Sequence, residues 1–183
     1  MRAAIGHNGG PDLTGLGWRT HCWRQAREKL LPTLPIEVVR LRVRRAAELG
    51  LDYKTYAGIR ASTGHDLVAF LFSSNALRLL GASPSLPQDR HAKLAALSAQ
   101  TLGLASRPLT PETMARLAPA LTATYPAPAH LGTFAQARAS LRAALGRVPP
   151  DTVLLVGDHA LEAEWCAAGR LAGYLSADRF FTA

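Results

Sequence analysis

The segment from residue 151 to 181, DTVLLVGDHALEAEWCAAGRLAGYLSADRFF, constrains the fold more than any other part of the chain. A short apolar run at 153–156 ends in Gly157-Asp158, an alanine-rich stretch follows, and a second apolar run occupies 171–175. This order predicts a strand, an acidic loop, a helix and a returning parallel strand. Asp158 would then lie at the carboxyl edge of the sheet, where open α/β sheets bind ligands.

The run LVAFLF after Asp66 is continuously apolar, which is typical of a central strand that is buried on both faces. We therefore predict strands at 67–73, 153–157 and 171–175 in a small parallel sheet. Residues Asp52 and Thr110 are expected N-caps, and Gly50 and Gly64 are expected to end helices. Helices are predicted at 18–31, 36–49, 53–62, 75–80, 90–103, 111–123 and 133–146. The predicted fold class is α/β, with a parallel sheet flanked by helices that outnumber the strands.

Composition divides the chain of 183 residues into three parts. Residues 1–17 contain five glycines and are expected to form a flexible leader, 18–63 a basic helical region, and 64–183 the α/β domain. No apolar run approaches the roughly 18 to 20 residues that span a bilayer, and the N-terminus lacks an apolar signal segment. Two distant cysteines fit reduced thiols. We expect a cytoplasmic protein with no membrane association.

The positive charge is concentrated in the first third of the chain. Residues 1–62 hold 11 lysines and arginines against 5 acidic residues, whereas residues 63–183 hold 10 against 8. Basic clusters favour acidic partners, either nucleic acid or an acidic protein surface. A solvated helix face with no partner explains the same pattern.

Two predicted helices, 36–49 and 53–62, are joined at Gly50 in a way that is typical of a helix-turn-helix. The second helix would face a groove of the nucleic acid, and arginines of the first would contact phosphates. Arg45 falls where such a unit normally packs an apolar residue, and similar helix corners occur in proteins that never bind DNA. The candidate nucleic-acid-binding residues are Arg40, Arg42, Arg44, Arg45, Lys54 and Arg60.

The sequence VLLVGDHALEAEWCAAGRLAGY resembles the closing unit of haloacid-dehalogenase-like (HAD-like) phosphatases, in which a strand ends in Gly-Asp and a second acid follows four residues later. In that family these acids hold Mg²⁺, so the resemblance implies Asp158 and Glu162 as metal ligands. AFLFSSNAL is similar to the family's second motif and implies that Ser73 or Ser74 contacts phosphate. The resemblance covers residues 67–80 and 130–181, and it implies a HAD-like or Rossmann-like sheet.

The chain departs from the HAD-like pattern at the nucleophile. The family's D-x-D pair occurs nowhere in the sequence, and Asp66 begins its strand instead of ending it. The family's cationic residue is also missing, with His130 the nearest candidate. His159 is placed at the ligand edge but has no identified nucleophile partner. Alternatively, Asp158 only caps the following helix.

Two functions follow from these patterns. The first is a non-catalytic binding or regulatory protein that needs no cofactor and binds nucleic acid through its basic helices. The alternative is a Mg²⁺-dependent HAD-like phosphatase or hydrolase with degenerate motifs, in which Asp158, Ser73 and Ser74 act at the catalytic site. The IGHNGG start also resembles leaders on some small bacterial and phage-derived proteins. The sequence leaves open the oligomeric state and whether Ser73, His130 and Asp158 converge.

Overall fold

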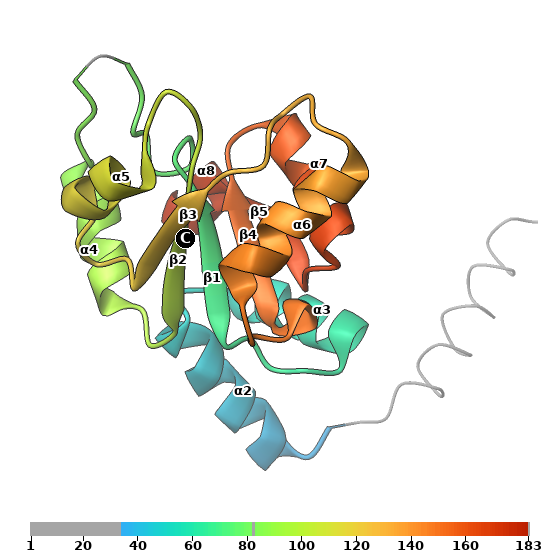
Figure 1. Ribbon diagram of the computed structural model, residues 1–183. Coiled ribbons are helices and arrows are strands. Elements are labelled where there is room, and N and C mark those ends of the chain that lie inside the picture. The colour runs from blue at the N-terminus through green and yellow to red at the C-terminus, as the bar shows by residue number, and fades with distance from the viewer. Residues whose placement is uncertain (1–33, 82, 183) are drawn as a thin grey trace, which may run out of the picture. The chain divides into compact units, whose positions relative to one another are not determined.

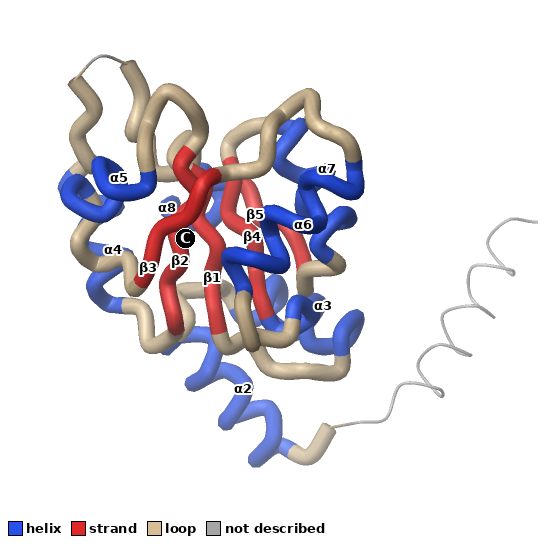
Figure 2. The backbone as a smooth tube through the Cα atoms, in the orientation of Figure 1, coloured by secondary structure: helices blue, strands red, loops and turns tan. Residues whose placement is uncertain are grey.

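Five parallel strands form the centre of the computed structural model, which describes residues 34–81 and 83–182. Residues Arg40–Ala183 form one compact unit, distinct from Met1–Val39. The strands are β1 (Ala69–Ser73), β2 (Gln100–Ala105), β3 (Ala123–Pro126), β4 (Val153–Gly157) and β5 (Gly173–Ser176). Their order is β3-β2-β1-β4-β5, and every neighbouring pair is parallel (Figures 1 and 2). The predicted α/β class is confirmed, and the sheet is of a small Rossmann-like type.

Helices cover both faces of this sheet. They are α2 (Ile36–Glu48), α3 (Tyr53–Thr63), α4 (Gln88–Ala96), α5 (Pro111–Leu117), α6 (Phe134–Leu145), α7 (Ala160–Gly169) and α8 (Ala177–Thr182), with a short 3₁₀ turn, η1 (Pro150–Thr152), before β4. None of the described helices combines the length and the apolar character that a membrane crossing requires.

Strand side chains alternate between two buried layers. On one face, Phe70 and Phe72 of β1 pack with Phe180 of α8, and both ring centroids lie 5.4 Å from that of Phe180. On the other face, Leu71 packs in a cluster with Leu141 of α6 and with side chains of α7. All five residues of β1 and of β4 are buried, which explains why these two strands read as continuous apolar runs in the sequence.

The predicted helix boundaries at several caps are confirmed. The Asp52 carboxylate accepts a hydrogen bond from the backbone N–H of Thr55, and Gly64 ends α3 in the left-handed conformation. The Thr110 hydroxyl accepts from the N–H of Thr113 at the start of α5. These side chains satisfy backbone groups that have no partner inside the helix.

The predictions were wrong where short strands follow helices. The predicted helix 90–103 ends as α4 at Ala96 and β2 begins at Gln100, and the predicted helix 111–123 ends as α5 at Leu117, before β3. The predicted helix at 75–80 is a turn, in which Arg78 adopts a positive φ of 57°. The leader and the 18–31 helix lie outside the described residues.

Helices α2 and α3 contribute to the same core as the sheet. Ala46, Leu49 and Tyr56 are buried in the cluster that contains Phe70 and Phe72. The compact unit therefore includes residues 40–63, which the sequence analysis assigned to a separate basic region.

Candidate functional site

The strand order places the topological switch point between β1 and β4. From β1 the chain continues through β2 to β3 on one side, and then crosses to β4 and β5 on the other. In open α/β sheets, the carboxyl ends of the two strands at such a point flank the ligand crevice. Here those ends carry Ser73, the last residue of β1, with Ser74 after it, and Asp158 and His159 after β4.

The side chain of Glu162, from the first turn of α7, occupies this switch point. It is fully buried and its two oxygens accept four hydrogen bonds. The donors are the Ser73 hydroxyl (2.9 Å), the Asn75 amide (2.8 Å) and the backbone N–H groups of Asp158 (2.8 Å) and His159 (3.3 Å). The carboxylate thus joins the loop after β1 to the loop after β4.

Gly157 lets Glu162 approach the end of β4. A Cβ atom at this position would lie 2.6 Å from Oε2 of Glu162 and 2.7 Å from the Tyr174 ring. Only glycine fits without displacing one of these groups. Close packing therefore explains the glycine of the Gly-Asp pair that resembles a phosphatase motif.

These contacts do not fit the magnesium site that the HAD-like resemblance implied. Both oxygens of Glu162 already accept hydrogen bonds, and a cation would have to displace these donors. Asp158 is exposed, and no group of three or more histidine, cysteine, aspartate or glutamate residues in the described part of the chain is arranged to hold a metal.

The two serines that were predicted to contact phosphate are also engaged within the fold. Ser73 is fully buried; its hydroxyl donates to Glu162 and accepts from the N–H of Ala76 (3.0 Å). The Ser74 hydroxyl accepts from the N–H of Ser106 (3.1 Å). Both hydroxyls therefore form hydrogen bonds that stabilise the carboxyl ends of β1 and β2.

Helix α7 begins with a capping box formed by His159 and Glu162. Nδ1 of His159 accepts from the N–H of Leu161 (3.2 Å), and the Glu162 carboxylate accepts from the N–H of His159. The alternative in which Asp158 caps this helix is wrong, because the cap is the next residue. The hydrogen bond from Leu161 orients the His159 ring so that Nδ1 faces the backbone of α7.

A cavity of about 920 Å³ lies at the carboxyl ends of β2 and β3. Its walls are the loops 105–111 and 126–130. Ser106 lies on one wall and His130 on the other. The Oγ atom of Ser106 and the Nδ1 atom of His130 are buried without a hydrogen-bond partner in the part of the chain that the structure describes. Leaving a buried polar atom unpaired costs about 1–3 kcal/mol, so such atoms are rare without a reason.

The His130 ring is fixed by aromatic contacts. It stacks on Trp165 of α7, with centroids 5.2 Å apart and an interplanar angle of 23°, and its centroid lies 6.0 Å from that of His159. Ser73 at the end of β1, and His130 and Asp158 on loops, therefore lie at the same sheet edge. Ser73 points into the fold, however, so these residues do not form one catalytic group.

The loop that contains Ser106 lies between two cavities. A second cavity of about 330 Å³ is lined by Ser74 and Asn75 on one side and by residues 106–110 on the other. Ser106 and Arg107 line both cavities, and Arg107 is exposed. Sequence reasoning missed this loop because β2 was predicted as a helix. A short apolar QTLGLA run before Ser-Arg-Pro is the signal for a strand and turn.

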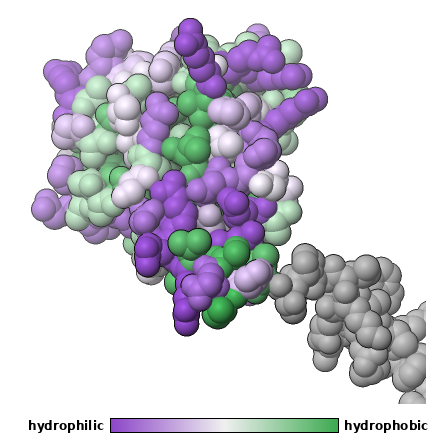
Figure 3. Space-filling view, turned by 90° about the horizontal axis from the view of Figure 1, so that it is seen from below, coloured by the Kyte–Doolittle hydropathy of each residue, from purple (hydrophilic) through white to green (hydrophobic). Residues whose placement is uncertain are grey.

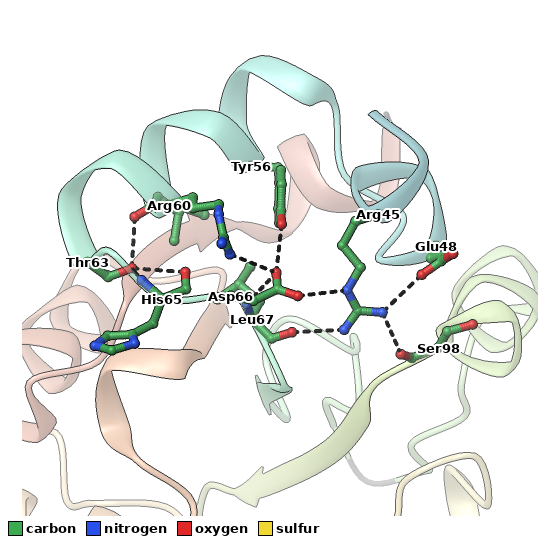
Figure 4. Close-up of polar contacts among 10 residues, drawn as sticks. Arg45, Glu48, Tyr56, Arg60, Thr63, His65, Asp66, Leu67 and Ser98 are labelled. Carbon is green, nitrogen blue, oxygen red and sulfur yellow. Dashed lines mark hydrogen bonds and ion pairs between the residues drawn. The ribbon is translucent and has the colours of Figure 1, made fainter. Parts of the chain in front are cut away.

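Arg45, predicted to contact nucleic acid, instead lies in a polar cluster before β1 (Figure 4). It donates to the Asp66 carboxylate (3.1 Å) and the Leu67 carbonyl oxygen (3.0 Å), and pairs with Glu48. This cluster explains why a charged residue stands where a helix-turn-helix packs an apolar one. Arg60 lies 3.8 Å from Asp66, so it also contributes to this cluster.

The other predicted nucleic-acid contacts are more accessible. Arg40, Arg44 and Lys54 are exposed, and Arg42 is half-buried. Leu41 and Val43, which alternate with the arginines of α2, are also exposed. The face seen from below mixes apolar and hydrophilic side chains in this way (Figure 3).

Replacing Asp66 with asparagine is expected to lower the free energy of unfolding by about 1–2 kcal/mol near neutral pH. Burial raises the pKa of Asp66, but hydrogen bonds from Tyr56 (2.7 Å) and Leu67, with the Arg45 charge, outweigh it and lower the pKa below its usual value. Because the folded-state pKa is lowered, this stabilisation is present above the unfolded-state pKa and is lost as pH falls through the folded-state value.

Urea denaturation of both proteins between pH 7 and pH 2 tests this. The difference between wild type and Asp66→Asn should shrink with acidification. A constant difference over the whole range would contradict a charge-dependent role for Asp66.

No protein-family model, curated protein or solved structure matches the chain significantly. The HAD-like resemblance stays a hypothesis.

Proposed function

We propose that the protein binds a small organic ligand in the cavity at the carboxyl ends of β2 and β3. The observation that supports this is that Ser106 and His130 line the same cavity, and that Oγ of the first and Nδ1 of the second are buried without a partner among the described residues. A ligand that hydrogen-bonds to these atoms would satisfy them. Cavities of about 300–1,000 Å³ at the carboxyl edge of an α/β sheet are common small-molecule sites.

The lining indicates the chemistry of the ligand. A serine hydroxyl donates and accepts, and an imidazole nitrogen does either according to its tautomer. Pro108, Leu109 and Pro126 supply apolar walls, and the Arg107 guanidinium is available to an anionic group. These features favour a ligand with an apolar body, at least one hydrogen-bonding group and a negative charge.

Binding is favoured over catalysis by the same two atoms. An activated serine nucleophile hydrogen-bonds to its general base. Ser106 Oγ makes no such bond to His130 Nδ1, since neither atom has a partner in the described part of the chain. Among the described residues, no base is in place to activate the Ser106 hydroxyl.

Ser106→Ala and His130→Phe are expected to abolish ligand binding while leaving the free protein as stable as wild type or more stable. Each substitution removes a buried polar atom that has no partner, so the apo fold loses no hydrogen bond at that atom. Thermal-shift screening with small heteroaromatic carboxylates, followed by two-dimensional NMR, measures both effects. Ser140→Ala on α6 is the matched control.

The screen also contains the outcome that contradicts the proposal. Hits should shift the amide signals of 105–110 and 126–130 in wild type, and should lose this effect in both variants but not in Ser140→Ala. Hits whose shifts map elsewhere, or that bind both variants normally, would reject the cavity as the site.

A second candidate is nucleic-acid binding through the first basic helices. It is favoured by the exposure of Arg40, Arg44 and Lys54, and by the excess of basic residues over acidic ones before residue 63. Such contacts release counterions, which makes affinity fall steeply with salt.

Arg40→Ala combined with Arg44→Ala is expected to reduce the salt dependence of duplex DNA binding. Losing two phosphate contacts should make the plot of log affinity against log salt shallower by about 2. Fluorescence anisotropy at several salt concentrations measures this, with Arg78→Ala plus Arg116→Ala as a control that removes equal charge elsewhere. Equal slopes for the two double variants would rule out a specific role for α2.

A further inference from the structure

A third cavity, of about 430 Å³, lies where α6 and α7 end. Three arginines line it: Arg138 and Arg142 from α6, and Arg170 after α7. The residues Pro150 and Asp151, which lead into the amino end of β4, form part of its wall. The cavity is thus at the amino edge of the sheet and shares no residue with the proposed ligand site.

The arginines of this cavity outnumber its acidic residues by three to one. All three arginines are exposed, and none makes an ion pair or side-chain hydrogen bond with another described residue. The acid in the lining is Asp151, whose carboxylate lies 3.4 Å from Nε2 of His65. An acidic ligand would therefore meet three cations whose donors are available.

Helix stability explains only part of this arrangement. Cations near a helix C-terminus interact favourably with the helix dipole, which accounts for Arg142 in the last turn of α6 and for Arg170. Arg138 lies a full turn earlier, four residues before Arg142, and like charges at this spacing repel each other. An anion between the two side chains would remove this repulsion.

The backbone conformation of Arg170 is a second feature of this cavity. Arg170 ends α7 in the left-handed conformation, with φ 53° and ψ 43°. Helices usually place glycine in this conformation, because a Cβ atom is disfavoured there. An arginine at a position that favours glycine carries backbone strain, and here its side chain lines the cavity.

We propose that this cavity binds the phosphate group of a small phosphorylated ligand. Guanidinium groups form paired, charge-assisted hydrogen bonds with phosphate oxygens, and three of them offer enough donors to surround one dianionic group. The volume exceeds that of a phosphate alone and leaves room for the organic part of the ligand against Val148 and Leu145.

Isothermal titration calorimetry with inorganic pyrophosphate tests the proposal on the full chain. Wild type should bind, and Arg138→Gln and Arg142→Gln should each weaken binding about tenfold. Arg170→Gly should also weaken binding about tenfold while raising Tm by a few degrees, because glycine relieves the backbone strain. If Arg170 had only a structural role, Arg170→Gly would raise Tm without weakening pyrophosphate binding. Arg116→Gln, which removes a charge on α5, should bind like wild type.

Several results would overturn the proposal. One is the absence of pyrophosphate binding at millimolar concentration, and another is binding that the three variants leave unchanged. A parallel titration with a single-stranded oligonucleotide separates a cavity from an extended surface. If the oligonucleotide binds, pyrophosphate does not compete with it, and Arg116→Gln weakens it as much as the cavity variants, the arginines form a general basic surface and not a phosphate site.

Discussion

Phe180→Ala is expected to lower the free energy of unfolding by about 3–5 kcal/mol, the range observed when a buried phenylalanine is truncated to alanine. Phe180 is fully buried, although α8 has only six residues. Its ring contacts both Phe70 and Phe72 of β1, so its loss leaves a cavity against the central strand. Urea denaturation monitored by circular dichroism measures the loss.

Phe134→Ala is the control for this experiment, because the same substitution is made on a ring that is 60% exposed at the start of α6. It should cost no more than about 0.5 kcal/mol. Cation–π contacts also hold α8 in place, with the Arg90 guanidinium 4.6 Å from the centroid of Phe181. Similar losses for Phe180→Ala and Phe134→Ala would mean that α8 is not part of the core.

Glu162→Met is expected to lower the free energy of unfolding by about 3 kcal/mol or more. Methionine has nearly the length of glutamate but accepts no strong hydrogen bond, so the buried N–H and O–H donors around Glu162 would lose their acceptor. Glu162→Gln should cost less, because it keeps one acceptor oxygen and the Asn75 amide can turn to present its own. Denaturation of the three proteins gives these differences.

Glu164→Met provides the matched control, since Glu164 is exposed on the same helix. It should change stability by less than about 0.5 kcal/mol. Repeating the wild-type measurement with millimolar Mg²⁺ separates the hydrogen-bonding role from metal binding. If Mg²⁺ raised the stability of wild type and not of Glu162→Gln, the carboxylate would be a metal ligand after all.

The sequence predicted β1, β4 and the edge strand β5, but not β2 and β3 on the other side of the sheet. The apolar runs of β1 and β4 are buried on both faces, so their composition alone identified them. By contrast, β3 has four residues, none of them fully buried, and β2 follows α4 after only three residues. Short strands of this kind carry no periodicity that separates them from a helix end.

The same limit applies to the candidate site. The sequence correctly predicted that β4 ends at Gly157-Asp158, and the HAD-like resemblance implied that Glu162 has a role there. The contact of Glu162 with Ser73 depends on β1 lying beside β4, which no local pattern reveals. Ser106 and His130 likewise face one cavity only because β2 and β3 are neighbours. The sequence alone showed that Arg45 occupies a position that is normally apolar in a helix-turn-helix. It did not show that Arg45 pairs with Asp66, which lies 21 residues away.

The buried carboxylate of Glu162 has a consequence for how folding depends on solutes. Rossmann-like proteins commonly hold a ligand's phosphate at backbone N–H groups of a helix N-terminus near the switch point, and such a ligand stabilises the folded state in proportion to its free concentration. Here a tethered anion bonds to the N–H groups of Asp158 and His159. Because this anion belongs to the chain, it cannot be diluted or dialysed away. The junction of β1 and β4 therefore forms without any exogenous anion.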